Sequence, residues 1–173
     1  MSQKVFFLGV IFMINNLFGG STNDSLKEGS LAPKFVAVDQ NNKTVKLEDY
    51  LGKQNVVLYF YPKDDTPGCT AQACSLRDGF SKLTSMGAVI LGVSADTSSS
   101  HKAFAEKYNL PFSLLADSDK ELIKKYDVAM PLIGIAKRVT FIIGKDGMIK
   151  KIFKSIDTSN HDDQVIEALE MLK

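Results

Sequence analysis

The chain contains two cysteines, Cys69 and Cys74, and their positions indicate redox chemistry. They follow Pro67-Gly68, which comes after an apolar, strand-like run at residues 56–61 and opens a helical pattern. Backbone N–H groups are unpaired in the first turn of a helix, and the helix dipole favours an anion there. A thiol at this position is shifted toward its reactive thiolate form. The second thiol, five residues on, makes the pair a candidate redox couple.

The elements around the cysteines predict a mixed α/β sheet. Two continuous apolar runs, residues 56–61 and 88–94, are typical of strands buried on both faces, with an amphipathic helix between them. Such a unit pairs its two strands in parallel. Further strands are predicted at residues 35–38, 44–47, 112–116, 139–143 and 148–153, and further helices at residues 98–108, 120–126 and 161–173. We therefore expect a thioredoxin-like α/β fold, with helices on both faces of a mixed central sheet. Ligands bind such sheets at the carboxyl ends of the parallel strands, where the Cys69 segment begins.

Length and charge restrict the classes of function. The 173 residues suit one domain with a full hydrophobic core. With 21 basic against 20 acidic residues, nothing indicates a nucleic acid or an anionic surface as a partner. His101 and His161 lie far from each other and from the cysteines, so a Cys/His metal site is poorly supported. Both histidines are expected on helix surfaces, and neither is assigned a role.

The N-terminal segment has the layout of a secretory signal peptide. Lys4 precedes an apolar run at residues 5–14, and Gly19-Gly20-Ser21 follows it. Because this run is short for a membrane span, residues 1–21 are predicted to be a cleaved signal for export to the periplasm or cell envelope. The alternatives are an uncleaved membrane anchor, or an apolar terminus without a targeting role on a cytoplasmic protein. Residues 22–28 are predicted to be a flexible lead-in and residues 29–173 the folded domain.

Export would offer a second explanation for the cysteines, because exported proteins use disulfides as structural staples. A staple across so short a loop stabilises a fold by roughly 2 kcal/mol, against about 5 kcal/mol for a long loop. On an ideal helix, Cα atoms five residues apart are about 8–9 Å from each other, whereas a disulfide requires roughly 7 Å or less. Two cysteines on one helix therefore cannot bond without local unwinding, which favours a switch over a staple.

Three segments carry the most specific pattern in the chain. Residues 62–70 contain Pro-x-x-x-Thr-x-x-Cys, residues 138–141 read Arg-Val-Thr-Phe, and residues 110–117 lie between them in sequence. These segments resemble the active-site segments of the AhpC/TSA-like peroxiredoxins. Within that family the resemblance is to the subgroup called bacterioferritin comigratory protein or peroxiredoxin Q. It extends from about residue 29 to the C-terminus. It implies a thiol peroxidase that reduces hydrogen peroxide and organic hydroperoxides in antioxidant defence.

The resemblance also implies roles for individual residues. Cys69 would be the peroxidatic thiolate that attacks the peroxide O–O bond and becomes a sulfenic acid. Arg138 would stabilise that thiolate as a permanent cation and hold the peroxide oxygens. It opens a strand expected to run antiparallel to residues 56–61, which would bring it to the sheet edge where Cys69 lies. Thr66 would hydrogen-bond the thiolate or the peroxide, and Pro62 would shield the site from water and limit over-oxidation.

Cys74 would be the resolving cysteine, which attacks the sulfenic acid, releases water and leaves a Cys69–Cys74 disulfide. Because Cys74 lies about 140° around the helix from Cys69, the first helical turns would have to open. A dithiol donor, thioredoxin in most of the family, would then reduce the disulfide. No cofactor or metal is implied. A resolving cysteine on the same helix removes the chemical need for a dimer, so a monomer is expected.

Structural interpretations of the same residues stay open. Arg138 could be a surface arginine at a strand end, and Thr66 an ordinary helix N-cap. Arg77 and Asp78 are expected to form a structural ion pair or a solvated helix face. Tyr59 is expected to be a strand and core residue.

Two other functions also stay open. A thioredoxin-like disulfide oxidoreductase shares the fold but normally carries Cys-x2-Cys, whereas this chain has Cys-x4-Cys. Peroxide consumption would separate that class from a peroxidase. The other is an exported binding domain with an inert disulfide, which thioredoxin would not reduce. Most members of the peroxiredoxin subgroup lack an export signal, so the compartment and the physiological reductant are not settled by the resemblance.

Overall fold

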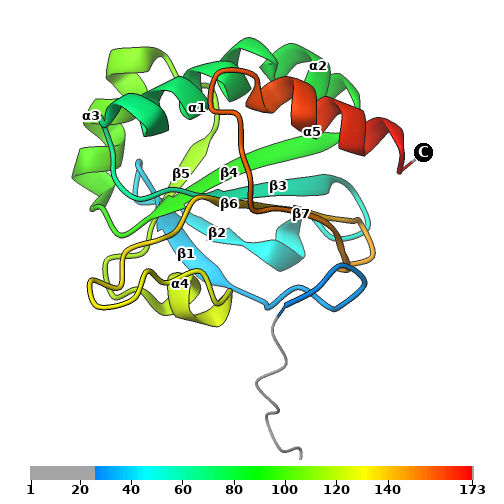
Figure 1. The fold of residues 1–173 in the computed structure, drawn as a ribbon, viewed down its shortest axis with the longest axis horizontal. Helices are drawn as coiled ribbons and strands as arrows, with labels where there is room; N and C mark the ends of the chain where they lie inside the picture. Colours follow the sequence, from blue (N-terminus) through cyan, green and yellow to red (C-terminus); the bar gives the residue numbers. More distant parts are fainter. Residues whose placement is uncertain (1–25, 173) are drawn as a thin grey trace, which may run out of the picture.

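The computed structural model of the protein describes residues 26–172, which form one seven-stranded sheet with helices on both faces (Figure 1). The predicted signal peptide lies outside the described residues. The strands follow the order β2-β1-β5-β4-β3-β6-β7 across the sheet. Their bounds are β1 Val36–Asp39, β2 Thr44–Lys46, β3 Asn55–Phe60, β4 Ala88–Ser94, β5 Ser113–Ala116, β6 Val139–Ile143 and β7 Ile149–Phe153. The predicted thioredoxin-like α/β class is confirmed by this mixed sheet.

Of the five α-helices in residues 26–172, four lie on one face of the sheet and one lies on the other (Figure 1). The four are α1 (Pro67–Asp78), α2 (Phe80–Ser85), α3 (Ser98–Tyr108) and α5 (His161–Glu170), and α4 (Glu121–Lys125) covers the opposite face. The helical stripe predicted after the cysteines is split at Gly79. A Cβ atom there would lie 2.5 Å from the Asp162 Cβ of α5, so glycine allows the close approach of the two elements. No helix within residues 26–172 is long and apolar enough to cross a membrane.

Strand β3 is buried on both faces because it divides two hydrophobic cores. Val56, Leu58 and Phe60 face the α4 side, whereas Val57 and Tyr59 face the side of α1, α2, α3 and α5. All five are fully buried. This alternation explains why the strand reads as a continuous apolar run in the sequence.

The neighbours of β3 determine where the loops meet. Strand β4 pairs with β3 in parallel, and β6 pairs with it antiparallel in a register that places Phe60 opposite Val139. The carboxyl end of β3 and the start of β6 therefore lie at the same edge of the sheet. The predicted parallel unit and the predicted antiparallel strand are both confirmed, and together they bring Arg138 to the loop that leads to Cys69.

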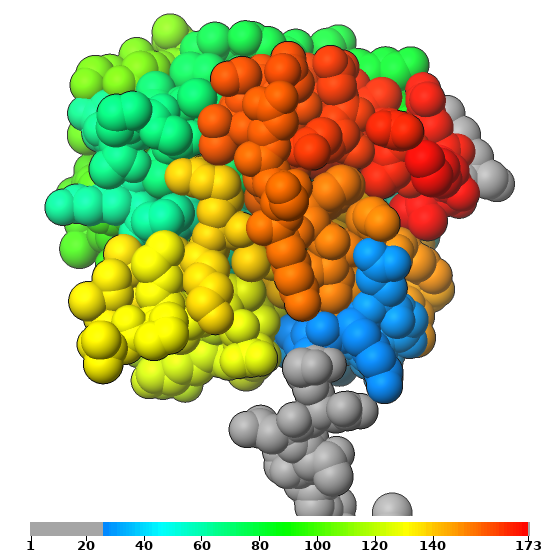
Figure 2. Space-filling model, in the orientation of Figure 1, coloured from blue at the N-terminus to red at the C-terminus, as the bar shows by residue number. Residues whose placement is uncertain are grey.

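The folded part of the chain begins before Gly29. Leu26 packs against the core on the α4 side, and Glu28 accepts a hydrogen bond from the Ile152 backbone N–H. The Gly29 N–H donates to the Ile149 carbonyl. Figure 2 shows this first described segment, in blue, lying against the orange residues of the β6–β7 hairpin. The end of the predicted flexible lead-in is thus held by contacts with the domain.

The expectation that the two histidines are surface residues is wrong. His101 and His161 are both 0% exposed, although each lies near the start of a helix. His161 Nε2 lies 2.9 Å from the Thr140 hydroxyl oxygen, and Nδ1 lies 3.0 Å from Gln164 Oε1. Burial lowers the pKa of His161 below its ordinary value of 6.5, which favours the neutral ring.

The buried neutral His161 predicts a loss of stability in mild acid. Below pH 6.5 the unfolded chain takes up a proton at this residue more readily than the folded chain does, so the free energy of unfolding falls as the pH falls. In His161→Gln this contribution is absent. Urea unfolding at about pH 7.5 and about pH 5.5 should show a smaller decrease in the variant than in the wild type. An equal or larger decrease would contradict the neutral, buried state of His161.

Candidate active site

Cys69 lies at the sheet edge where helix α1 begins. It is the third residue of α1, after Pro67 in the first turn, and it is 1% exposed. The first turn of α1 contains no acidic side chain, so the partial positive charge of the helix N-terminus is not neutralised locally. This arrangement favours a negative charge on the Cys69 sulfur.

Arg138 contacts the Cys69 thiol directly. Its Nη2 donates a hydrogen bond to Cys69 Sγ at 3.3 Å, from the residue that precedes β6. Gly68 leaves room for this approach, and a Cβ atom at that position would crowd Arg138 Nη2 at 3.2 Å. A guanidinium group is charged at every physiological pH. The structure therefore places a permanent cation against the sulfur, and Arg138 is half-buried.

Gln72 is a member of the site that sequence reasoning missed. It is fully buried one turn after Cys69, and its Oε1 accepts a hydrogen bond from Arg138 Nη1 (2.5 Å). Its Nε2 has no hydrogen-bond partner among the described residues. The three-residue spacing from Cys69 places both side chains on one face of the helix and is a signal by which Gln72 could have been found.

Removing the Gln72 amide should leave the Arg138 guanidinium less well positioned, because its hydrogen bond to Gln72 Oε1 is lost. We expect kcat/KM for hydrogen peroxide to fall by roughly tenfold in Gln72→Ala, because a hydrogen bond to a charged group contributes about 1.5 kcal/mol or more. Gln72→Glu retains an acceptor for the guanidinium but adds a negative charge beside the Cys69 thiolate, so it should lose at least as much. Steady-state peroxidase assays measure both variants. A kcat/KM in Gln72→Ala equal to that of the wild type would exclude a role for Gln72 in positioning Arg138.

Thr66 and Pro62 flank the loop between β3 and α1. Thr66 is the N-cap residue of α1, but its side chain makes no capping hydrogen bond. Its hydroxyl instead donates to the Lys63 carbonyl at 3.1 Å, which leaves the oxygen lone pairs free to accept. Pro62 directly follows the buried Tyr61 at the end of β3 and is itself half-buried.

Cys74 lies on α1 together with Cys69, and both are free thiols. Cys74 is partly exposed, whereas Cys69 is buried. The expected ion pair nearby is present: Arg77 lies 2.8 Å from the Asp78 carboxylate and also donates to the Tyr108 carbonyl. With both cysteines on a continuous helix, a disulfide between them requires this part of α1 to unwind.

Tyr59 is a buried phenol near Cys69 and Arg138. Its hydroxyl has no hydrogen-bond partner among residues 26–172. Burial, with smaller contributions from neighbouring charges, raises the pKa of Tyr59 well above its usual value of 10. Tyr59 therefore stays neutral at the site. Within the same residues, no three His, Cys, Asp or Glu side chains are grouped to hold a metal ion.

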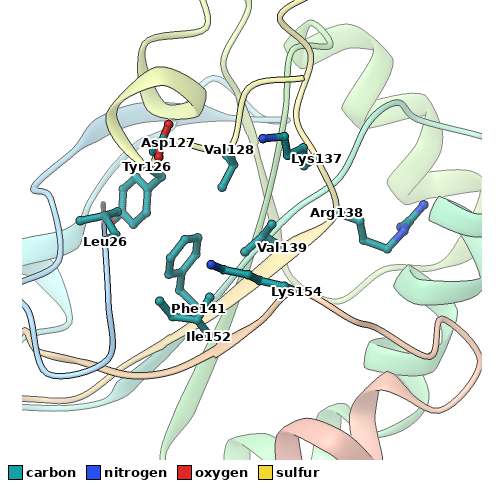
Figure 3. Close-up of a pocket in the computed structure, with 10 residues that line it drawn as sticks. All are labelled: Leu26, Tyr126, Asp127, Val128, Lys137, Arg138, Val139, Phe141, Ile152 and Lys154. Atoms are coloured by element: carbon teal, nitrogen blue, oxygen red, sulfur yellow. The ribbon is translucent and has the colours of Figure 1, made fainter. Parts of the chain in front are cut away.

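A pocket of about 280 Å³ adjoins the site but lies on the α4 side of the sheet (Figure 3). Its lining includes Leu26, Tyr126, Phe141 and Lys154. Arg138 contributes to its edge, yet Figure 3 shows the guanidinium pointing away from the other labelled side chains. Cys69 does not line this pocket, so its cavity is separate from the thiol site.

The chain is similar to known proteins over most of its length. Residues 29–152 match the AhpC/TSA family. Over 148 residues the chain is 41% identical to chloroplastic peroxiredoxin Q of Sedum lineare. The matched region covers 84% of this chain and 79% of the plant protein. The crystal structure of peroxidoxin BcpB from Mycobacterium tuberculosis has a TM-score of 0.80 at 30% identity and covers 86% of this chain and 99% of that chain. A mutant of PrxQ from Xylella fastidiosa has a TM-score of 0.79 at 28% identity, with 85% and 97% covered.

The chain therefore belongs to the AhpC/TSA family. Within that family it is similar to the peroxiredoxin Q and Bcp proteins, and it is a thiol peroxidase, an oxidoreductase. The predicted family, the thioredoxin-like fold and the class of enzyme are confirmed.

Proposed function

We propose that Cys69 is the peroxidatic residue and that its contact with Arg138 is the observation that carries this assignment. The Cys69 thiolate attacks one oxygen of a hydroperoxide. The S–O bond forms while the O–O bond breaks, and the leaving oxygen takes a proton to become water or an alcohol. Cys69 is left as a sulfenic acid.

Three other residues would support this step. Arg138 stabilises the thiolate in the ground state and the negative charge that develops on the leaving oxygen. The Thr66 hydroxyl donates to the Lys63 carbonyl, so it is oriented to accept a hydrogen bond from the peroxide O–H. Half-buried Pro62 limits the access of water and of a second peroxide molecule to the sulfur.

Cys74 would resolve the sulfenic acid. Its sulfur attacks Cys69 Sγ, the S–S bond forms, the S–O bond breaks, and the released hydroxide takes a proton to give water. Support comes from its place on the same helix and from its partial exposure. A thioredoxin-type dithiol then reduces the Cys69–Cys74 disulfide by thiol–disulfide exchange, which restores both thiols.

The proposal is tested by peroxide turnover with thioredoxin and thioredoxin reductase. Wild type should turn over continuously, and Cys74→Ser should consume one equivalent of peroxide and then stall with this donor. Dithiothreitol serves as a control for the choice of reductant. If the wild type leaves peroxide untouched with either donor, the assignment of the two cysteines fails.

We also infer export of the protein, with cleavage near residue 21, from Lys4 and the apolar run at residues 5–14. The plant relative is named chloroplastic, so members of this group do occur in compartments that require an N-terminal targeting segment. The mature domain would begin within residues 22–29 and act as a monomer without membrane association. N-terminal sequencing of protein recovered from cell fractions tests the cleavage, and light scattering after gel filtration tests the monomer. An intact N-terminus in the cytoplasmic fraction would overturn export.

A further inference from the structure

Asp64 is a buried carboxylate in the loop that connects β3 to α1. It is 7% exposed, and its oxygens accept three hydrogen bonds from side chains. Tyr61 Oη donates to Oδ1 at 2.7 Å, and Ser100 Oγ donates to Oδ2 at 2.7 Å. The third donor is His101 Nδ1, at 2.9 Å from Oδ2.

The ring of His101 links Asp64 to strand β5. Its Nε2 lies 3.1 Å from the Leu115 carbonyl oxygen, a group that only accepts hydrogen bonds. Its Nδ1 faces the Asp64 carboxylate, which also accepts. The fully buried ring therefore lies between the Asp64 carboxylate and the Leu115 carbonyl oxygen. Burial alone would raise the pKa of Asp64, but hydrogen bonding and the charge of His101, followed by Ser100 and Tyr61, lower it below its usual 3.8.

The backbone of Asp64 is hydrogen-bonded as well as its side chain. Its N–H donates to Asp96 Oδ2 at 2.9 Å, and Ser94 Oγ, at the end of β4, donates to the same oxygen at 2.6 Å. Asp64 is thus held by the residue that follows β3, by Asp96 in the loop after β4 and by α3, and His101 connects it to β5. A buried charged contact is weak evidence for a role in stability, since apolar residues of similar volume often serve as well. The position of this contact, in the loop directly before α1, points to a role in placing that loop.

The loop determines the geometry of the thiol site. Asp64 lies two residues after Pro62 and two residues before Thr66, and α1 begins directly after Thr66. The opening of α1 that a Cys69–Cys74 disulfide requires would start next to this loop. If Asp64 stays in place, unwinding is confined to the residues after this loop. Helix α1 then re-forms from the same first residue when the disulfide is reduced.

We propose that the buried Asp64–His101 contact is a positioning pair that fixes the loop at residues 62–66, and through it holds Cys69 against Arg138 in the reduced enzyme. This inference rests on the proposed role of Cys69. Neither residue contacts the reacting atoms. The pair acts through the loop, and its loss should slow the reaction with peroxide in protein that is still folded.

Asp65 offers a matched control in the same loop. Its carboxylate receives hydrogen bonds from Lys107 Nζ (2.7 Å) and Tyr108 Oη (2.6 Å), so it also ties the loop to α3. Its side chain is 47% exposed, and an exposed ion pair contributes little. Asp65→Asn makes the same chemical change one residue away from Asp64→Asn.

The test is the rate at which one equivalent of hydrogen peroxide oxidises Cys69 in single-turnover experiments. All variants carry Cys74→Ser, so that the first step is isolated from resolution, and rates are measured well below each unfolding temperature. Asp64→Asn should be slower than the Cys74→Ser parent by about tenfold or more, and Asp65→Asn should stay within about twofold. If Asp64→Asn lowers the unfolding temperature but reacts at the rate of the parent, the pair is only structural and the inference fails.

His101→Gln provides the second arm, since Asp64 keeps its Tyr61 and Ser100 donors. Should Asp64→Asn not fold, the single-turnover rate of His101→Gln decides, with the same slowing expected. If the Cys74→Ser parent itself does not react with peroxide, the assignment of Cys69 fails and this inference with it. Failure of the inference alone leaves the parent active.

Discussion

Replacing Cys69 by serine is expected to reduce peroxide turnover by about 10³-fold or more, because the hydroxyl is a far weaker nucleophile than the thiolate. The loss should appear in kcat/KM for hydrogen peroxide and for an organic hydroperoxide alike. The fold should be preserved, since the serine side chain is of similar size in the same buried position. Peroxide consumption with dithiothreitol as reductant measures the effect.

Serine at Cys74 is the matched control for that substitution. Cys74→Ser should react with the first equivalent of peroxide at close to the wild-type rate and lose only the turnover that depends on thioredoxin. If instead Cys69→Ser retained turnover and Cys74→Ser had none, the roles assigned to the two thiols would be exchanged.

Replacing Arg138 by glutamine should lower the second-order rate of Cys69 oxidation by roughly 10²–10³-fold. The variant removes a permanent cation and the donor that lies 3.3 Å from Cys69 Sγ. Turnover in the presence of a competing peroxidase of known rate measures the constant over this range. Arg138 is half-buried at the end of the sheet, so the variant should remain folded.

Arg138→Lys separates charge from geometry. Lysine keeps the positive charge but cannot donate to Cys69 and Gln72 at once through two guanidinium nitrogens. We expect a rate between those of Arg138→Gln and the wild type. A rate in Arg138→Gln within about twofold of the wild type would contradict the role of Arg138 in the first chemical step.

The sequence was sufficient for most elements of the fold. Strands β3 and β4 are continuous apolar runs because each is covered on both faces, and this burial is visible without any partner. The meeting of Cys69 and Arg138 followed from the family resemblance and from the antiparallel pairing of β6 with β3. The single helical stripe after the cysteines was predicted without its break at Gly79. That break depends on Asp162, which is distant in sequence.

The burial of these polar residues and their partners could not be predicted from the sequence, for a similar reason. His101 meets Asp64 across 37 positions of the chain, and His161 meets Thr140 across 21. No local sequence pattern indicates hydrogen-bond partners so far along the chain. A histidine for which no partner is known is expected on the surface. The location of Gln72 could have been predicted, because its spacing from Cys69 places it on the same helix face. Its hydrogen-bond partner could not, because Arg138 lies 66 positions away in the chain.

The most direct test of the account is the intact mass of the protein after one equivalent of hydrogen peroxide. Wild type should lose two hydrogens, as the Cys69–Cys74 disulfide forms. Cys74→Ser should gain one oxygen as the Cys69 sulfenic acid, which dimedone traps, and Cys69→Ser should be unchanged. An unchanged wild-type mass, or an oxygen gained by Cys69→Ser at Cys74, would contradict the peroxidatic role of Cys69.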